Sequence, residues 1–119
     1  MNDSKTICPL RYLTEIFGGK WKLPILCTLS GDKPQRYSTI KRRVGSITNM
    51  MLAQSLKELE ADGMVNRTQY NEIPPRVEYS LTEKGRRALP MLGAAAKWAL
   101  DEMSGNGLSP NCEDCQASC

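Results

Sequence analysis

The 119-residue sequence predicts a mainly helical α+β fold that carries one small β-hairpin. Apolar residues recur at helical spacing over most of the chain, and the period changes to two only between residues 64 and 81. The length suits one domain, and 40% hydrophobic with 24% charged residues is typical of a globular chain with a real core. The sequence has no internal repeat, so its elements can be assigned in chain order.

Two helices are predicted at the start of the chain. Residues 9–17 place apolar side chains at helical intervals, and Gly18-Gly19 ends this pattern. Residues 21–29 are apolar on nearly all sides, as expected of a helix at the centre of a small bundle. Pro24 fits this second helix only if the helix begins near Lys20, because proline is tolerated in the first turn.

The next two helices form a predicted helix-turn-helix. Ser38 is expected to cap a short helix through Val44, and Thr48 to cap a longer helix that ends at Asp62, before Gly63. The longer helix has a stripe of apolar residues that we expect to be buried: Leu52, Leu56 and Leu59, with Met51 beside them. Two closely spaced helices, the second of them amphipathic, are typical of this motif.

A hairpin and a closing helix complete the predicted fold. Residues 64–70 and 77–81 alternate between two faces, and two prolines stiffen the intervening segment 71–76. Thr82 is expected to cap a last helical segment, which Pro90 kinks or restarts. The order of the elements describes a winged helix-turn-helix with terminal helices available for dimerisation.

Several spaced motifs between residues 8 and 103 carry a family resemblance. They are Cys8-Pro9, Gly18-Gly19-Lys20-Trp21, Ile47-Thr48-x-x-Met51-Leu52, Leu56-x-x-Leu59-x-x-Asp62-Gly63 and Pro74-Pro75-x-Val77-Glu78-Tyr79-x-Leu81-Thr82-x-x-Gly85. In this order they resemble the HxlR-type winged helix-turn-helix regulators, a MarR-like family. The resemblance implies a homodimeric bacterial or archaeal transcription regulator, and some members sense electrophiles or oxidants through a cysteine at the Cys8 position. Met50 departs from the family pattern, which often has a basic residue there.

The charge is distributed unevenly along three predicted segments. We expect an N-terminal arm over residues 1–7, the winged helix-turn-helix domain with its dimerisation helices over 8–106, and an acidic, cysteine-containing tail over 107–119. Residues 1–100 carry a net charge of +7, whereas residues 101–119 carry −4. A basic body favours a polyanionic partner, and nucleic acid is favoured over a membrane.

The longer helix of the motif is the predicted reader of DNA bases. Its outward face carries Thr48, Asn49, Met50, Ala53, Gln54 and Lys57. Gln54 and Asn49 have paired donor and acceptor groups that suit adenine edges, whereas Met50 and Ala53 can contact a thymine methyl group. Lys57 is expected to meet a phosphate. The alternative is that this face is simply the solvated side of an amphipathic helix.

Further DNA contacts are predicted from basic residues around this helix. Arg76 at the hairpin tip is expected in the minor groove, with a solvated loop arginine as the alternative. A second group precedes the base-reading helix and would bind phosphates, with an ordinary charged face as the alternative: Arg36, Ser38, Lys41, Arg42 and Arg43. For Lys41 the charged face is the favoured interpretation. The partner would be double-stranded DNA with a pseudo-palindromic operator, because one copy reads only a few base pairs.

The last helix has more apolar residues than one small core can absorb. The predicted dimer surface, with the first helix as its partner, consists of Met91, Leu92, Ala95, Trp98, Ala99 and Met103. Packing of Trp98 inside its own chain is the alternative for that residue.

Five cysteines leave a redox role open. Cys8 precedes Pro9 and is expected at a helix N-cap, where the helix dipole favours a reactive thiolate, with a structural thiol as the alternative. Cys27 lies among apolar residues and is expected in the core. The tail thiols are Cys112, Cys115 and Cys119. They could resolve an oxidised Cys8 of the other subunit, bind zinc with an unidentified fourth ligand, or do nothing.

Composition excludes several other classes. The absence of histidine removes Ser-His-Asp and Cys-His catalysis and every zinc site that needs imidazole. We expect no enzyme and no cofactor, and we assign no residue as a metal ligand. The longest uncharged run, residues 44–56, has only 13 residues, which predicts no membrane span and a cytoplasmic location. A winged helix used only for protein contacts and a CxxC dithiol redox protein are the remaining alternatives. The sequence leaves open whether a small molecule or an oxidant acts as inducer.

Overall fold

The computed structural model describes residues 6–109, which form six helices and one three-stranded antiparallel sheet. The elements are α1 (Pro9–Phe17), α2 (Lys22–Thr28), β1 (Gln35–Arg36), α3 (Tyr37–Val44), α4 (Asn49–Ala61), β2 (Val65–Tyr70), β3 (Arg76–Leu81), α5 (Glu83–Arg87) and α6 (Leu89–Gly105). The predicted mainly helical α+β class and the winged helix-turn-helix arrangement are confirmed.

The sheet has the strand order β1-β3-β2. Strands β2 and β3 form the predicted hairpin, with Val65 opposite Leu81 and Tyr70 opposite Arg76 at its far end. Strand β1 pairs with β3 and was not predicted, because two residues are too few to show an alternating pattern. We call the hairpin, residues 65–81, the wing.

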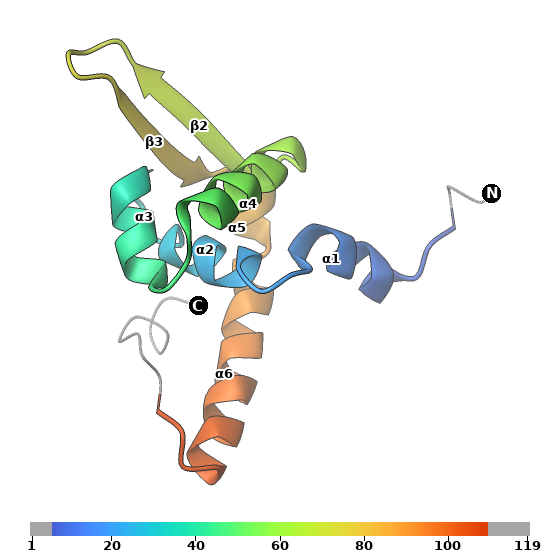
Figure 1. Cartoon of the computed structure of the whole chain (residues 1–119). Coiled ribbons are helices and arrows are strands. Elements are labelled where there is room, and N and C mark those ends of the chain that lie inside the picture. Colours follow the sequence, from blue (N-terminus) through green and yellow to red (C-terminus); the bar gives the residue numbers. More distant parts are fainter. Residues whose placement is uncertain (1–5, 110–119) are drawn as a thin grey trace.

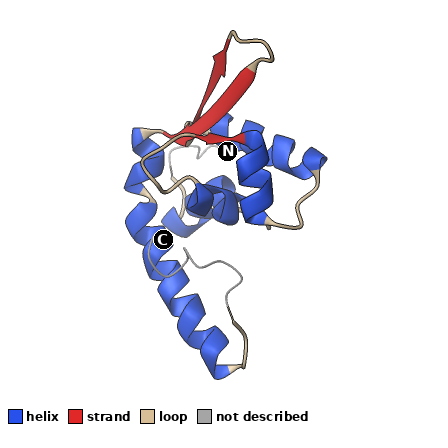
Figure 2. Cartoon of the chain, turned by 90° about the vertical axis from the view of Figure 1, so that its left-hand side faces the viewer, coloured by secondary structure: helices blue, strands red, loops and turns tan. Residues whose placement is uncertain are grey.

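Two parts of the chain project from the helical body in opposite directions. The wing extends beyond α3 and α4, whereas most of α6 extends away on the other side (Figure 1). The view from the side shows the same arrangement (Figure 2). The wing and the helix-turn-helix therefore lie at one end of the molecule, and most of α6 lies at the other.

The core lies between α2, α3, α4 and the base of the wing. Ile25, Leu26, Ile40 and Met64 are almost fully enclosed, and further core residues come from α1 and α6. The predicted stripe on α4 is confirmed, since Leu52, Leu56 and Leu59 are at most 2% exposed. Met51 is 40% exposed, which corrects its expected burial, because it lies on the flank of the stripe and outside the core contact.

Hydroxyl groups cap two helices as predicted. The Thr48 hydroxyl accepts a hydrogen bond from the Met51 amide, and the Thr82 hydroxyl accepts one from the Gly85 amide. Thr82 also donates to the Gly63 carbonyl, which joins α5 to the turn after α4. The predicted cap at Ser38 is wrong, because β1 leads directly into α3 and leaves the extended Arg36 at the N-cap.

All three prolines in helices occupy first turns, and Pro9 is the first residue of α1. Helix α2 begins at Lys22, so Pro24 lies in the first turn, where its missing N–H costs the helix no backbone hydrogen bond. Pro90 lies in the first turn of α6 and follows a break at Ala88, where α5 ends. The closing segment is therefore two helices, and Pro90 restarts rather than kinks it.

Candidate nucleic-acid interface

The outward face of α4 presents polar and apolar groups opposite its buried leucines. Thr48, Asn49, Gln54 and Lys57 are all exposed, and Met50 is 78% exposed at the start of the helix. The structure therefore brings together the side chains that the sequence predicted for base and phosphate contacts. Their spacing suits insertion of the N-terminal half of α4 into a major groove.

Gln54 is held by a neighbour that the sequence prediction did not include. Its Nε2 donates to Glu58 Oε2 at 2.6 Å, and the other carboxylate oxygen of Glu58 lies 2.8 Å from Lys22 Nζ on α2. The hydrogen bond from Gln54, followed by the contact with Lys22, lowers the pKa of the Glu58 carboxyl group. The i, i+4 spacing of Gln54 and Glu58 could have revealed the first contact, whereas the contact with Lys22 depends on the fold.

Helix α3 carries the predicted phosphate-binding residues beside α4. Arg36, Ser38, Arg42 and Arg43 are exposed, whereas Lys41 is half-buried. Within residues 6–109, no ion pair engages Arg36 or Arg42. The Tyr37 hydroxyl donates to the Asn49 carbonyl at 3.0 Å, so the starts of α3 and α4 are joined directly.

Arg76 does not extend freely from the wing tip as the sequence suggested. It is the first residue of β3, and its guanidinium lies 2.8 Å from Glu72 Oε2 and 2.7 Å from Glu78 Oε2. The guanidinium also stacks over the Tyr70 ring, 4.0 Å from its centroid. Hydrogen bonding to Glu72 is the main cause of a raised Arg76 pKa. The side chain is only 27% exposed, so entry into a minor groove would require it to leave both carboxylates.

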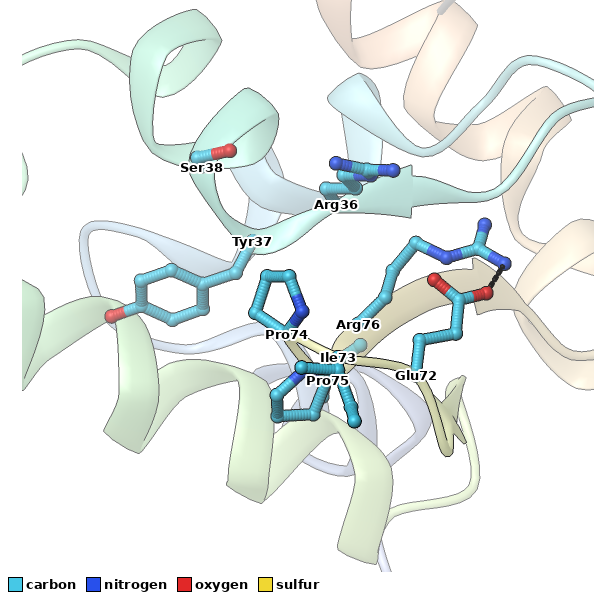
Figure 3. Close-up of a pocket in the computed structure, with 9 residues that line it drawn as sticks. Arg36, Tyr37, Ser38, Glu72, Ile73, Pro74, Pro75 and Arg76 are labelled. Carbon is cyan, nitrogen blue, oxygen red and sulfur yellow. Dashed lines mark hydrogen bonds and ion pairs between the residues drawn. The ribbon is translucent and has the colours of Figure 1, made fainter.

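A hollow of about 480 Å³ separates the wing tip from the start of α3. Arg36, Tyr37 and Ser38 line one side, and the segment from Glu72 to Val77 lines the other (Figure 3). Ile73 is fully exposed at the tip. The hollow is open to solvent, and Arg36 and Arg76 lie on its opposite sides.

Two of the five cysteines, Cys8 and Cys27, lie within the described residues. Cys8 is exposed and free at the N-cap of α1, where the sequence placed it. Cys27 is half-buried and disulfide-bonded, which corrects the expectation of a thiol enclosed in the core. Cys112, Cys115 and Cys119 lie outside the described residues.

The apolar side of α6 is partly free. Trp98 is 68% exposed, and Ala95 is exposed, whereas Met91, Ala99 and Met103 are half-buried. Leu92 is 5% exposed and packs in this chain's own core. It also lines a nearly apolar groove of about 370 Å³, which runs between α2 and α6 with Trp98 at its edge.

Neither a metal-binding cluster nor a membrane-spanning helix is present in the described part of the chain. Residues 6–109 contain no cluster of three or more cysteine, aspartate or glutamate side chains arranged to hold a metal ion. No helix in the same range is long and apolar enough to cross a membrane.

Comparisons with known proteins agree with this geometry. The profile of the HxlR-like helix-turn-helix family matches residues 16–106. An uncharacterized HTH-type transcriptional regulator of Methanothermobacter thermautotrophicus is 47% identical over 98 residues, which cover 82% of this chain and 74% of that protein.

Solved structures resemble the whole arrangement of helices and wing. The redox regulator HypR in its oxidised form is 42% identical with a TM-score of 0.72, covering 79% of this chain and 96% of that one. The reduced transcriptional regulator YodB of Bacillus subtilis is 33% identical with a TM-score of 0.69, and the match covers 81% of this chain and 94% of YodB. With its winged helix-turn-helix and this profile match, the chain belongs to the HxlR-like helix-turn-helix family of transcriptional regulators.

Proposed function

We propose that this transcription regulator is a homodimeric repressor that reads a pseudo-palindromic operator and is switched by thiol oxidation. The observation that carries the DNA-reading part is the exposed face of α4, which lies opposite a fully buried leucine stripe and beside the arginines of α3. The domain responsible would span residues 8–106, with 1–7 as an arm and 107–119 as a tail.

Base reading is assigned to the first half of α4. Asn49 and Gln54 carry amides that can pair with adenine, and Met50 is exposed enough to contact a thymine methyl group. Thr48 and Lys57 lie at the margins of this surface and would contact the sugar-phosphate backbone.

Phosphate contacts, which add affinity without sequence preference, are assigned to α3 and to Arg36 directly before it. Arg36, Ser38, Arg42 and Arg43 would hold the phosphates that flank the major groove. The wing would lie along the adjacent minor groove. Arg76 would enter it only where the negative potential of a narrow groove outcompetes Glu72 and Glu78.

Dimerisation is assigned to α6 and α1. Met91, Ala95, Trp98, Ala99 and Met103 supply apolar surface on α6, and the exposed Leu10 and Tyr12 supply it on α1. Two copies would present two recognition helices to half-sites about 34 Å apart. Repression follows if such a dimer occupies a promoter.

The thiol switch is supported by the position of Cys8 and by two relatives. Cys8 is free and exposed at the N-cap of α1, where an oxidant can reach its sulfur. HypR is called a redox regulator and was solved in oxidised and reduced forms, and YodB was solved after diamide treatment. Oxidation would join Cys8 of one subunit to a tail cysteine of the other subunit that is still a thiol, one of Cys112, Cys115 or Cys119, and pass two electrons and two protons to an oxidant such as diamide.

The test is fluorescence anisotropy with DNA that flanks the protein's own gene, compared with scrambled DNA, in reductant and after diamide. We expect tighter binding to the flanking DNA and loss of this preference after oxidation. Preference unchanged by diamide would overturn the switch but retain the DNA-binding function. Binding without preference at any salt concentration would contradict operator recognition. Absence of salt-dependent binding would favour a module for protein contacts.

A further inference from the structure

We infer that Glu58 is a positioning residue that fixes the direction of the Gln54 amide for adenine recognition. This inference rests on the proposed reading of a base by Gln54. It concerns a side chain that itself does not reach the DNA, and it links the base-reading face of α4 to the core helix α2.

The three groups form a continuous chain of short contacts. Gln54 Nε2 donates to Glu58 Oε2 at 2.6 Å, and Lys22 Nζ lies 2.8 Å from Glu58 Oε1. Each carboxylate oxygen therefore has its own donor. Lys22 is only 12% exposed, so the carboxylate is fixed by a side chain that is itself enclosed.

Gln54 and Glu58 lie one helical turn apart on α4. Gln54 is exposed on the side of the helix away from the leucine stripe. Glu58 lies on the flank that faces α2, since it meets Lys22 there. A contact between these two residues therefore draws the Gln54 side chain into one conformation without removing it from the outward face.

The chemistry of the contact selects one orientation of the amide. An ionised carboxylate only accepts hydrogen bonds, so the nitrogen of Gln54 must face Glu58. The flipped amide would place its oxygen against the carboxylate, which is repulsive. The amide oxygen and the second N–H then remain available to the DNA, and adenine N6 and N7 require this acceptor and donor pair.

Lys22 connects the contact between Gln54 and Glu58 to the core helix α2. An exposed Gln-Glu pair alone would exchange between rotamers, and ordering it on binding would cost conformational entropy. With the second carboxylate oxygen held from α2, the amide is oriented before DNA arrives. Loss of this orientation should reduce discrimination at one base position and leave phosphate-dependent binding intact.

The experiment compares Glu58→Gln with Glu60→Gln. Glu60 is exposed on the same helix, so its substitution removes the same charge without touching Gln54. Anisotropy is measured on the operator and on a set of single-base variants of it. Gln54→Ala identifies the base position that Gln54 reads, as the position at which discrimination disappears.

We expect Glu58→Gln to lower discrimination at that position by about fivefold or more, within the range of one bidentate contact. Glu60→Gln should change it by less than about twofold, and both variants should bind random DNA alike. Lys22→Gln leaves the carboxylate but removes its anchor, and we expect a smaller loss at the same position. Thermal melting checks that all variants are folded.

Two results would overturn the inference. In the first, Glu58→Gln and Glu60→Gln behave alike while Gln54→Ala loses discrimination. In the second, Gln54→Ala changes no base position, so that Glu58 has nothing to position. Neither result affects the wild-type preference for the operator over scrambled DNA, whose absence would instead contradict the proposed function.

Discussion

Arg76 shows how neighbouring side chains can restrain a residue whose type alone suggests DNA contact. Its guanidinium has two carboxylates and an aromatic ring as partners in the free protein. Minor-groove entry must therefore compete with Glu72 and Glu78. The sequence places both acids close to Arg76, but only the register of the hairpin brings them onto one guanidinium.

Glu72→Gln should strengthen DNA binding, because it removes one of these competitors. Exposed ion pairs contribute little to stability, so the gain in affinity should be small, about fivefold at most. Anisotropy on the operator would measure it. Glu83→Gln makes the same charge change on α5, away from the wing tip. Equal gains from both variants would show that only net charge matters and that Arg76 stays with its carboxylates.

Arg42→Ala should weaken binding to all DNA sequences by the same factor. The side chain is exposed on α3, and the described ion pairs do not include it. Loss of one phosphate contact should reduce the slope of log affinity against log salt by about one. Lys97→Ala on α6 is the matched control and should leave the slope unchanged. A selective loss on the operator alone would assign Arg42 to base reading instead.

Glu58 should make stability depend on pH in acid. Its folded pKa is held below the ordinary 4.5, chiefly by the hydrogen bond from Gln54 and then by Lys22. A lowered pKa means that this stabilisation is complete above the ordinary value and is lost as the pH falls through the folded value. Urea unfolding of wild type and Glu58→Gln should therefore give different free energies at neutral pH that converge as the pH falls from about 5 through the lowered folded pKa of Glu58. A constant difference over this range would contradict the assignment.

At the scale of elements, local signals predicted most of the fold. Thr48 and Thr82 marked two helix starts correctly, because a capping hydroxyl acts on an amide only three residues away. The start of α3 was misplaced, because β1 is defined by pairing with β3 more than 40 residues later. The outward face of α4 was predictable from its period. The link from Glu58 to Lys22 was not, because it joins two helices.

Gly85 marks the closest approach between α5 and the wing. A methyl group there would collide with the Met64 carbonyl oxygen and would also crowd Leu81. Gly85→Ala should therefore lower the free energy of unfolding by about 1–3 kcal/mol, as overpacking does elsewhere. Urea titration would measure this loss. Gly31→Ala is the control, because a methyl group at Gly31 meets open space. Equal stability of the two variants would contradict the close approach.

At the scale of the molecule, the proposed dimer rests on the apolar side of α6. Trp98→Glu places a charge on an exposed aromatic residue beside the apolar groove. We expect the variant to be monomeric by light scattering at micromolar concentration, where the wild type is dimeric. Ser104→Glu adds the same charge on the opposite side of α6 from the residues that line the groove. If both variants remain dimeric, the dimer interface lies on another surface.

The break between α5 and α6 at Ala88 allows α6 to tilt as one rigid helix about its first turn. Seventeen residues of helix are about 25 Å long, and the helix meets the DNA-facing part of the chain at one end only (Figure 1). A tilt of about 10° at its base would displace the far end by about 4 Å, close to the rise of one base pair. In a dimer joined through α6, a small angular change would thus move the two recognition helices out of register with their half-sites.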